Sequence, residues 1–145
     1  MIPAAAFLLA VLQPTGGAVQ LYENGFCAGI SWITLREGET VAREDGPDFA
    51  VWRVNGPGDA WWGVYAGNAA QVSGLDAHPF TARDGVTITA RSDSNGFQGY
   101  LAQNRQGWQN HFFGSVFHNG RDDLAFFQRV DFSPAGQAKC EAHRG

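Results

Sequence analysis

Short apolar runs separated by turn residues dominate this chain, and their side chains alternate as in strands rather than following a helical period. No window long enough for an ordinary amphipathic helix keeps apolar side chains three and four residues apart. β-branched and aromatic residues, which favour strands, fill the runs, and Gly, Pro, Asn and Asp bound them. The pattern predicts strands over residues 30–35, 40–44, 48–54, 60–66, 86–91, 99–103, 108–117 and 124–132.

Glycine marks the turns between these runs. The chain has 19 glycines, and they fall at turn positions rather than at a repeating interval. Asn-Gly pairs, which tolerate the positive φ angles of tight hairpin turns, stand at 24–25, 55–56, 95–96 and 119–120. We therefore expect one all-β or β-rich domain, an antiparallel meander folded as a sandwich or barrel of seven or eight strands with at most one short helix.

Alternation within the runs indicates which strands are central. In residues 86–91, apolar side chains alternate with Thr and Arg, which predicts a strand with one face in water. Residues 49–54 and 61–66 are largely apolar on both faces. We expect these two runs to pair in the middle of the sheet, across the turn at 55–59.

Residues 124–132 are open to two interpretations. Apolar side chains alternate along this run, and an Asn-Gly turn precedes it, which favours a strand. Alternatively, Asp122 caps a short helix that carries Leu124, Phe127 and Val130. Of the two, we expect the strand.

The N-terminus has the composition of an export signal. Residues 2–12 are apolar, Pro14 ends any helix there, and small residues precede position 19, where a signal peptidase would cut. The apolar stretch is shorter than the roughly 20 residues that span a bilayer, so we expect no transmembrane segment. We interpret residues 1–18 as a signal peptide and 19–145 as the folded domain. Because no Lys or Arg precedes the apolar stretch, the alternative is a short N-terminal helix packed on the domain.

Two cysteines, Cys27 and Cys140, lie near the two ends of the predicted domain. In an oxidising compartment, an even number of cysteines in a small domain indicates a disulfide. We therefore predict a Cys27–Cys140 bond and a periplasmic or secreted location. The alternative is two buried free thiols in a reducing compartment. The spacing of the two cysteines suits neither a CxxC redox pair nor a zinc site.

Charge and missing motifs exclude several classes of function. The chain has 14 acidic and 10 basic residues, and its net charge of −4 makes nucleic acid a poor partner. The sequence contains no Gly-x-Ser-x-Gly elbow, no P-loop and no Gly-x-Gly-x-x-Gly that opens a helix. The turn at 93–96 lacks the carboxylates of a calcium loop. We expect neither serine hydrolysis nor a cofactor nor a bound metal.

The candidate acid–base or metal-binding groups are His111, His118 and Asp122. The two histidines are seven residues apart, so on one strand they would point to opposite faces. Only a bulge at Gly114 would bring them together. The alternative is that one histidine ends a strand and the other lies in a turn, where each serves in hydrogen bonds.

Aromatic side chains are the most unusual resource of this chain, which has five Trp, three Tyr and 11 Phe. Trp61 and Trp62 are adjacent and must face opposite sides of a strand. We expect one of them to fill the core and the other, with Tyr65 and Trp108, to form an aromatic binding surface. The alternative is that packing covers both tryptophans.

These observations predict a small exported protein that binds a glycan, a peptide or a partner protein and performs no catalysis. The second hypothesis is a hydrolase that uses His and Asp groups from distant strands. The third is an inhibitor or immunity protein for an extracellular hydrolase. An exposed tryptophan in a groove would favour the first hypothesis, and a His–carboxylate pair would favour the second.

Overall fold

The computed structural model describes residues 17–67 and 74–144. Its helices are α2 (Asp123–Phe127) and α3 (Pro134–His143). Its strands are β1 (Gly17–Ala18), β2 (Gly25–Ala28), β3 (Ser31–Thr34), β4 (Thr40–Asp45), β5 (Phe49–Asn55), β6 (Trp61–Gly67), β7 (Asp76–Arg83), β8 (Val86–Asp93), β9 (Gly96–Gln103), β10 (Gln109–Gly114) and β11 (Val130–Asp131).

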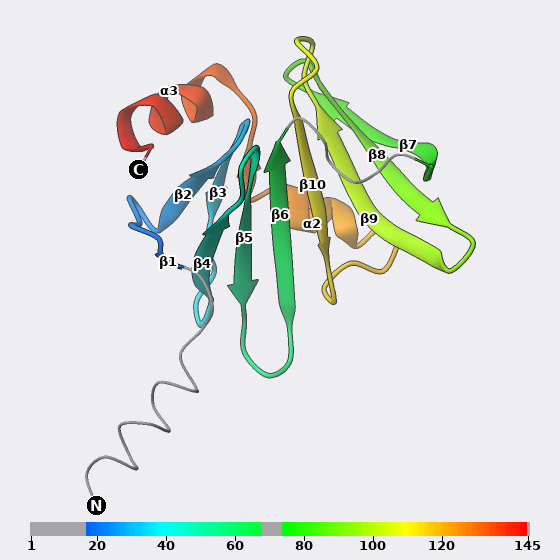
Figure 1. Ribbon diagram of the computed structural model, residues 1–145, viewed down its shortest axis with the longest axis horizontal. Coiled ribbons are helices and arrows are strands. Elements are labelled where there is room, and N and C mark those ends of the chain that lie inside the picture. The colour runs from blue at the N-terminus through cyan, green and yellow to red at the C-terminus, as the bar shows by residue number, and fades with distance from the viewer. Residues whose placement is uncertain (1–16, 68–73, 145) are drawn as a thin grey trace, which may run out of the picture.

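The strands form two antiparallel sheets (Figure 1). Eight strands make a large sheet in the order β1-β4-β5-β6-β10-β9-β8-β7, and three make a small sheet in the order β11-β3-β2. Helix α2 lies behind the large sheet in the view of Figure 1, and α3 packs on β2 and β3 of the small sheet. The prediction of one β-rich, antiparallel domain is confirmed.

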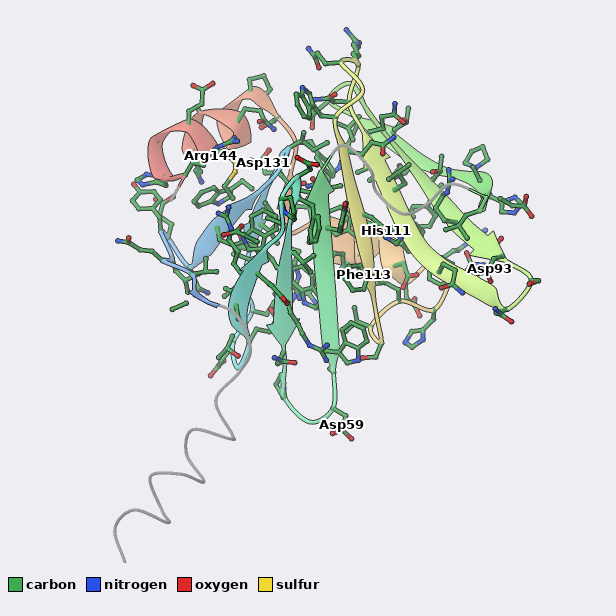
Figure 2. The ribbon with its side chains drawn as sticks, in the orientation of Figure 1. Asp59, Asp93, His111, Phe113, Asp131 and Arg144 are labelled. Atoms are coloured by element: carbon green, nitrogen blue, oxygen red, sulfur yellow. A yellow bond between two sulfur atoms is a disulfide. The ribbon has the colours of Figure 1, made fainter. Side chains whose placement is uncertain are left out.

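The large sheet joins two meanders, β4–β6 and β7–β10, at the point where β10 pairs with β6. The two runs predicted to be central form the hairpin of β5 and β6, in register from Phe49 opposite Gly67 to Asn55 opposite Trp61. Asp59 lies in the turn between them (Figure 2). This pairing confirms the predicted hairpin and places it inside the sheet.

The hydrophobic core lies between α2, the small sheet and one face of the large sheet, which we call the inner face. Trp62, Tyr100 and Phe112 point to this face and are fully buried. Phe126 of α2 packs edge-to-face on Trp62, with ring centroids 4.9 Å apart. Phe127 packs edge-to-face on Tyr100, with ring centroids 5.4 Å apart. Edge-to-face packing is a favoured geometry for aromatic pairs. The short helix α2 is therefore held by packing and not by its intrinsic helix propensity.

The prediction of a strand over residues 124–132 is wrong, because these residues form most of α2, a turn and the short strand β11. Phe126 and Phe127 are adjacent and both buried. Successive side chains of a strand point to opposite faces, so a strand with only one face on the core could not bury both, whereas a helical turn can. Tertiary burial of two neighbouring aromatic rings thus decides the structure of this segment.

The alternative helix is present only in part, because α2 ends at Phe127, Leu124 is exposed and Val130 lies in β11. Asp122 makes no capping hydrogen bond with its side chain. The next residue, the buried Asp123, accepts hydrogen bonds from the backbone N–H groups of His118 (3.1 Å) and Asn119 (3.0 Å). The hydroxyl of Tyr100 donates to the same carboxylate at 2.5 Å. Burial raises the pKa of Tyr100, and the hydrogen bond with Asp123 and its charge raise it further. Tyr100 therefore stays protonated and holds α2 against the sheet as a donor.

Helix α3 was not predicted, and with it the chain exceeds the one short helix that the pattern allowed. Its ten residues bury only Gly136 and Cys140, so no apolar period marks it in the sequence. The Ser133 hydroxyl accepts a hydrogen bond from the backbone N–H of Gly136 at 3.4 Å, as an N-cap does. Pro134 follows at the first helical position, where its missing N–H costs no hydrogen bond.

Strand β7 was also not predicted. It contains Pro79, and its side chains are exposed or only half-buried, so no alternation marks it. As the last strand of the large sheet, β7 pairs only with β8, and an edge strand tolerates a proline whose missing N–H faces away from its partner. The register shifts between Pro79 and Thr81, where the strand is irregular.

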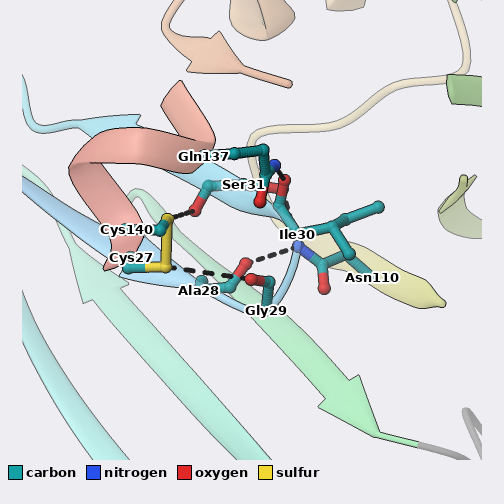
Figure 3. Close-up of a disulfide and its surroundings, with 8 residues drawn as sticks. All are labelled: Cys27, Ala28, Gly29, Ile30, Ser31, Asn110, Gln137 and Cys140. Atoms are coloured by element: carbon teal, nitrogen blue, oxygen red, sulfur yellow. Dashed lines mark hydrogen bonds between the residues drawn. A yellow bond between two sulfur atoms is a disulfide. The ribbon is translucent and has the colours of Figure 1, made fainter. Parts of the chain in front are cut away.

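Cys27 and Cys140 form the predicted disulfide, which joins β2 to α3 (Figure 3). Their Cα atoms are 5.1 Å apart, within the usual range for disulfides. The bond fixes the last helix of the chain on the small sheet. Most of the predicted signal peptide lies outside the described residues, and the rest forms β1 beside β4. In the part of the chain that the structure describes, no helix is long and apolar enough to cross a membrane.

We expect the substitution Cys27→Ala to lower the free energy of unfolding by about 2 to 5 kcal/mol in oxidising buffer, because the bond closes a long loop and restricts the unfolded chain. Denaturant unfolding of wild type and variant measures the difference. In reducing buffer the two proteins should unfold at nearly the same denaturant concentration. Two free sulfhydryls in unfolded, unreduced protein would contradict the account.

Candidate functional site

The predicted acid–base candidates do not form one cluster. His111 lies on β10, next to Phe113, on the outer face of the large sheet, opposite the core (Figure 2). His118 and Asp122 are exposed in the segment that leads to α2, and they line one cavity of about 340 Å³. Within residues 17–67 and 74–144, no group of three His, Cys, Asp or Glu side chains is arranged to hold a metal ion.

The surroundings of His111 are those of a packed side chain. Its ring lies over Gly99, where a β-carbon would come within 3.0 Å of Nε2. Burial lowers the pKa of His111, the charge of Arg91 lowers it further, and a hydrogen bond with the backbone of Gln98 opposes both. The imidazole is therefore neutral at pH 7.

His111 should make the fold sensitive to mild acid. Its pKa is lower in the folded protein than in the unfolded chain, where it is about 6.5, so the unfolded state binds more protons below that pH. We expect the free energy of unfolding to fall as the pH drops below about 6.5. In His111→Gln this decrease should be smaller, as urea unfolding at each pH would measure.

The substitution His118→Gln is the matched control for this experiment, because His118 is exposed. It should keep the pH dependence of the wild type. Identical pH dependence in wild type and His111→Gln would show that the folded state does not favour a neutral imidazole at this position.

A buried ion pair lines the cavity beside His118. Arg129 Nη1 lies 2.7 Å from Glu39 Oε1, and each side chain is only 8% exposed. The indole N–H of Trp62 donates to the other carboxylate oxygen at 3.1 Å, and the backbone N–H of Arg36 donates to the first. Burial alone would raise the pKa of Glu39, but these hydrogen bonds and the charge of Arg129 lower it overall. The carboxylate is held as an anion by structural partners, which makes it a poor proton carrier.

Trp61 and Trp62 lie on opposite faces of β6. Trp62 is 1% exposed in the core, whereas Trp61 is partly exposed on the outer face. The guanidinium of Arg53 stacks over the Trp61 ring at 4.3 Å, and Phe113 meets that ring edge-on at 6.1 Å. Tyr65 lies farther along the same face. The aromatic surface here is already packed against neighbours from the same sheet.

Trp108 is the most exposed large apolar side chain in the described part of the chain, with 55% of it exposed. It ends the loop 104–108 between β9 and β10. Asn104 Oδ1 accepts hydrogen bonds from the backbone N–H groups of Gln106 (3.1 Å) and Trp108 (2.9 Å), and the N–H of Asn104 donates to the Trp108 carbonyl at 3.0 Å. Gly107 turns the chain with a φ of 89°. The loop is thus a defined turn that fixes the backbone of Trp108.

A groove runs between this loop and α3. One cavity of about 380 Å³ lies beside Trp108, and another of about 720 Å³ adjoins it. The two are neighbours, because Ile30, Asn104 and Gln137 line both. We call this hollow the Trp108 groove. Its polar lining consists of Asp84, Asn104, Arg105, Gln106, Gln109, Asn110, Gln137, Glu141 and Arg144.

The turn between β2 and β3, part of which lines the Trp108 groove, is bonded from two sides (Figure 3). Asn110 of β10 is fully buried, and its Nδ2 donates to the carbonyl of Ala28 at 2.7 Å and to the hydroxyl of Ser31 at 2.6 Å. From α3, Gln137 Nε2 donates to the carbonyl of Ile30. The large sheet and α3 are therefore fixed to the same turn, so the groove is formed before any ligand enters.

Of the binding residues predicted from the sequence, Trp108 lines this groove, whereas the three on β6 do not. Asn104, Asn110 and Gln137 were missed, because an isolated amide side chain belongs to no motif. The spacing of Asn104 and Gly107 around a turn was a usable signal, since Asn bonds its own backbone and Gly supplies the positive φ.

No protein-family model matches this chain, and no curated protein and no solved structure matches it either. A function for this chain therefore has to be inferred from the chemistry of the site.

Proposed function

We propose that this chain is an exported, non-catalytic binding protein that takes its ligand in the Trp108 groove. The exposed indole of Trp108 carries this proposal. Most large aromatic rings of this domain are packed in its core, and this one stands in water on a turn that Asn104 holds in place. Tryptophan is enriched among the residues that supply most of the binding energy of an interface.

The size and order of the groove support the same proposal. Its two cavities, of about 380 and 720 Å³, fall within the range of about 300 to 1,000 Å³ that is common for small-ligand sites. The walls are held by the Cys27–Cys140 bond and by the hydrogen bonds of Asn110 and Gln137. A pre-formed site binds without an ordering cost, which favours affinity.

Several groups that a catalyst would use are already engaged in holding the fold. Glu39 is paired with Arg129, and His111 is packed over Gly99. Asp123 accepts hydrogen bonds from the backbone and from a tyrosine. These contacts favour binding over proton transfer as the task of this protein.

A hydrolase remains the second candidate function, because His118 and Asp122 line one cavity. A general acid or base contributes roughly 100-fold or more to a rate, so its removal abolishes most of the turnover. Turnover of a glycan or peptide substrate that disappears in His118→Ala would replace the binding proposal with this one.

Export is part of the proposal. The uncharged N-terminal segment has the pattern of a signal peptide, and a disulfide is typical of oxidising compartments. We expect the protein recovered from its native host to begin at Val19 or within two residues of it, and intact-mass measurement of that protein decides the matter. A cytoplasmic protein that begins at Met1 would contradict export.

The binding proposal predicts a difference between two tryptophans. On arrays of immobilised glycans and peptides, we expect the wild type to be retained and Trp108→Ala to lose about 1 to 2 kcal/mol of binding free energy, roughly tenfold in affinity. Trp61→Ala is the matched control, because it removes a partly exposed indole from the outer face of the large sheet, away from the Trp108 groove. It should bind as the wild type does.

Circular dichroism and a thermal melt of each variant check that the fold is intact. Loss of binding in Trp61→Ala but not in Trp108→Ala would move the site to the outer face. Retention on none of the arrayed molecules would overturn the proposal.

A further inference from the structure

The charged side chains of the Trp108 groove balance one another. Asp84 and Glu141 contribute two negative charges, and Arg105 and Arg144 contribute two positive charges. A site selects an ion by presenting a field of the opposite sign. Arg144 is the one charged residue that lines the cavity beside Trp108, and Asp84, Glu141 and Arg105 line the larger cavity. Each cavity thus departs from neutrality by a single charge, of opposite sign in the two, which selects an ion only weakly and favours a ligand without net charge.

Amide side chains make up the rest of the polar lining, and they are Asn104, Gln106, Gln109, Asn110 and Gln137. An amide presents two N–H donors and a carbonyl acceptor, and a hydroxyl group is likewise both donor and acceptor. Some of these atoms already serve the fold, since Asn104 Oδ1 accepts two hydrogen bonds and Gln137 Nε2 donates one. A ligand rich in hydroxyl groups can pair with the remaining amide atoms, whether these donate or accept. An apolar ligand would cover amides without pairing them, which is unfavourable.

Asn110 contains an acceptor that no described residue satisfies. Its Nδ2 is fixed by two acceptors, the carbonyl of Ala28 and the hydroxyl of Ser31, so the amide cannot be turned round. Its Oδ1 is buried, has no hydrogen-bond partner in residues 17–67 and 74–144, and lies beside Gly29 and Ala66, which also line the groove. A buried acceptor without a donor is rare in proteins, and it makes this wall of the groove polar.

An extended peptide fits this groove less well. Peptides that bind along a sheet add a strand to an unpaired edge. The strands beside the loop, β9 and β10, are paired on both sides, and the opposite wall is helix α3. The groove thus offers side chains and no free strand edge. A sugar ring needs only what is present, since one face is rich in C–H groups that suit the Trp108 ring, and its rim carries hydroxyls.

We propose that the ligand of the Trp108 groove is an uncharged oligosaccharide. The inference rests on the proposed binding function and adds the class of ligand. The sugar stacks on Trp108, and its hydroxyl groups pair with the accessible amides of the lining.

Tryptophan fluorescence tests this inference on the full chain. The probes are chitotetraose, cellotetraose and maltotetraose, with acetylated and amidated tetra-alanine as an uncharged peptide and tetraglutamate as an anion. Of the tryptophans described, Trp108 is the most exposed, so stacking of a sugar on it should shift the emission to shorter wavelength. We expect at least one tetrasaccharide to do so and the two peptides to have no effect.

Variants assign the signal to the groove. Trp108→Ala should abolish the shift and weaken binding of the tetrasaccharide, measured by calorimetry, at least tenfold. Trp108→Phe, which keeps an aromatic ring, should restore part of the affinity. Trp61→Ala should bind within twofold of the wild type.

The outcomes separate this inference from the proposed function. Binding of tetra-alanine or tetraglutamate that Trp108→Ala abolishes, without binding of any tetrasaccharide, would overturn the saccharide and leave the groove as a binding site. No Trp108-dependent binding of any probe would overturn the saccharide inference, and the array experiment then decides on the groove. Release of shorter saccharides from a probe would show catalysis and overturn the non-catalytic proposal.

Discussion

The hydrogen bonds and the disulfide that fix the turn between β2 and β3 are the constraint on which the rest of this structure depends. Asn110 of the large sheet and Gln137 of α3 both donate hydrogen bonds to carbonyl groups of this turn. The Cys27–Cys140 disulfide links α3 to the adjoining strand β2. Without these contacts α3 has little to hold it, because it buries few of its side chains. The groove exists because sheet, helix and loop meet around this one turn.

Buried polar groups specify the core in the same way. Aromatic rings can pack in many arrangements, but the Glu39–Arg129 pair and the Tyr100–Asp123 hydrogen bond each have only one satisfied geometry. The indole N–H of Trp62 joins the first of these networks, which fixes one tryptophan of the adjacent pair to the core. Tyr100, Glu39 and Asp123 thereby serve the structure, as does His111, which packs over Gly99. The exposed Trp108 differs from them because its side chain has no such structural role.

The sequence predicted the parts of the fold that alternation and turn chemistry control. It identified the hairpin of β5 and β6, the one-sided strand β8 and the disulfide, because each leaves a local signal. It missed α3 and β7, whose stability comes from their neighbours, and it assigned a strand where two adjacent phenylalanines are buried by a helical turn. Asn110 and Gln137 escaped notice because their partners lie about 80 and 107 residues away in sequence, beyond what any local pattern records.

The central claim is that an uncharged saccharide binds on Trp108 in a groove that is already formed. The indole N–H signals of ¹⁵N-labelled protein, assigned with Trp108→Phe, report on this claim directly during a titration with chitotetraose, cellotetraose or maltotetraose. The account predicts that the Trp108 signal moves with the added sugar while the signal of the buried Trp62 stays in place. Movement of the Trp61 signal with a stationary Trp108 signal, or no movement with any of the three sugars, would contradict it.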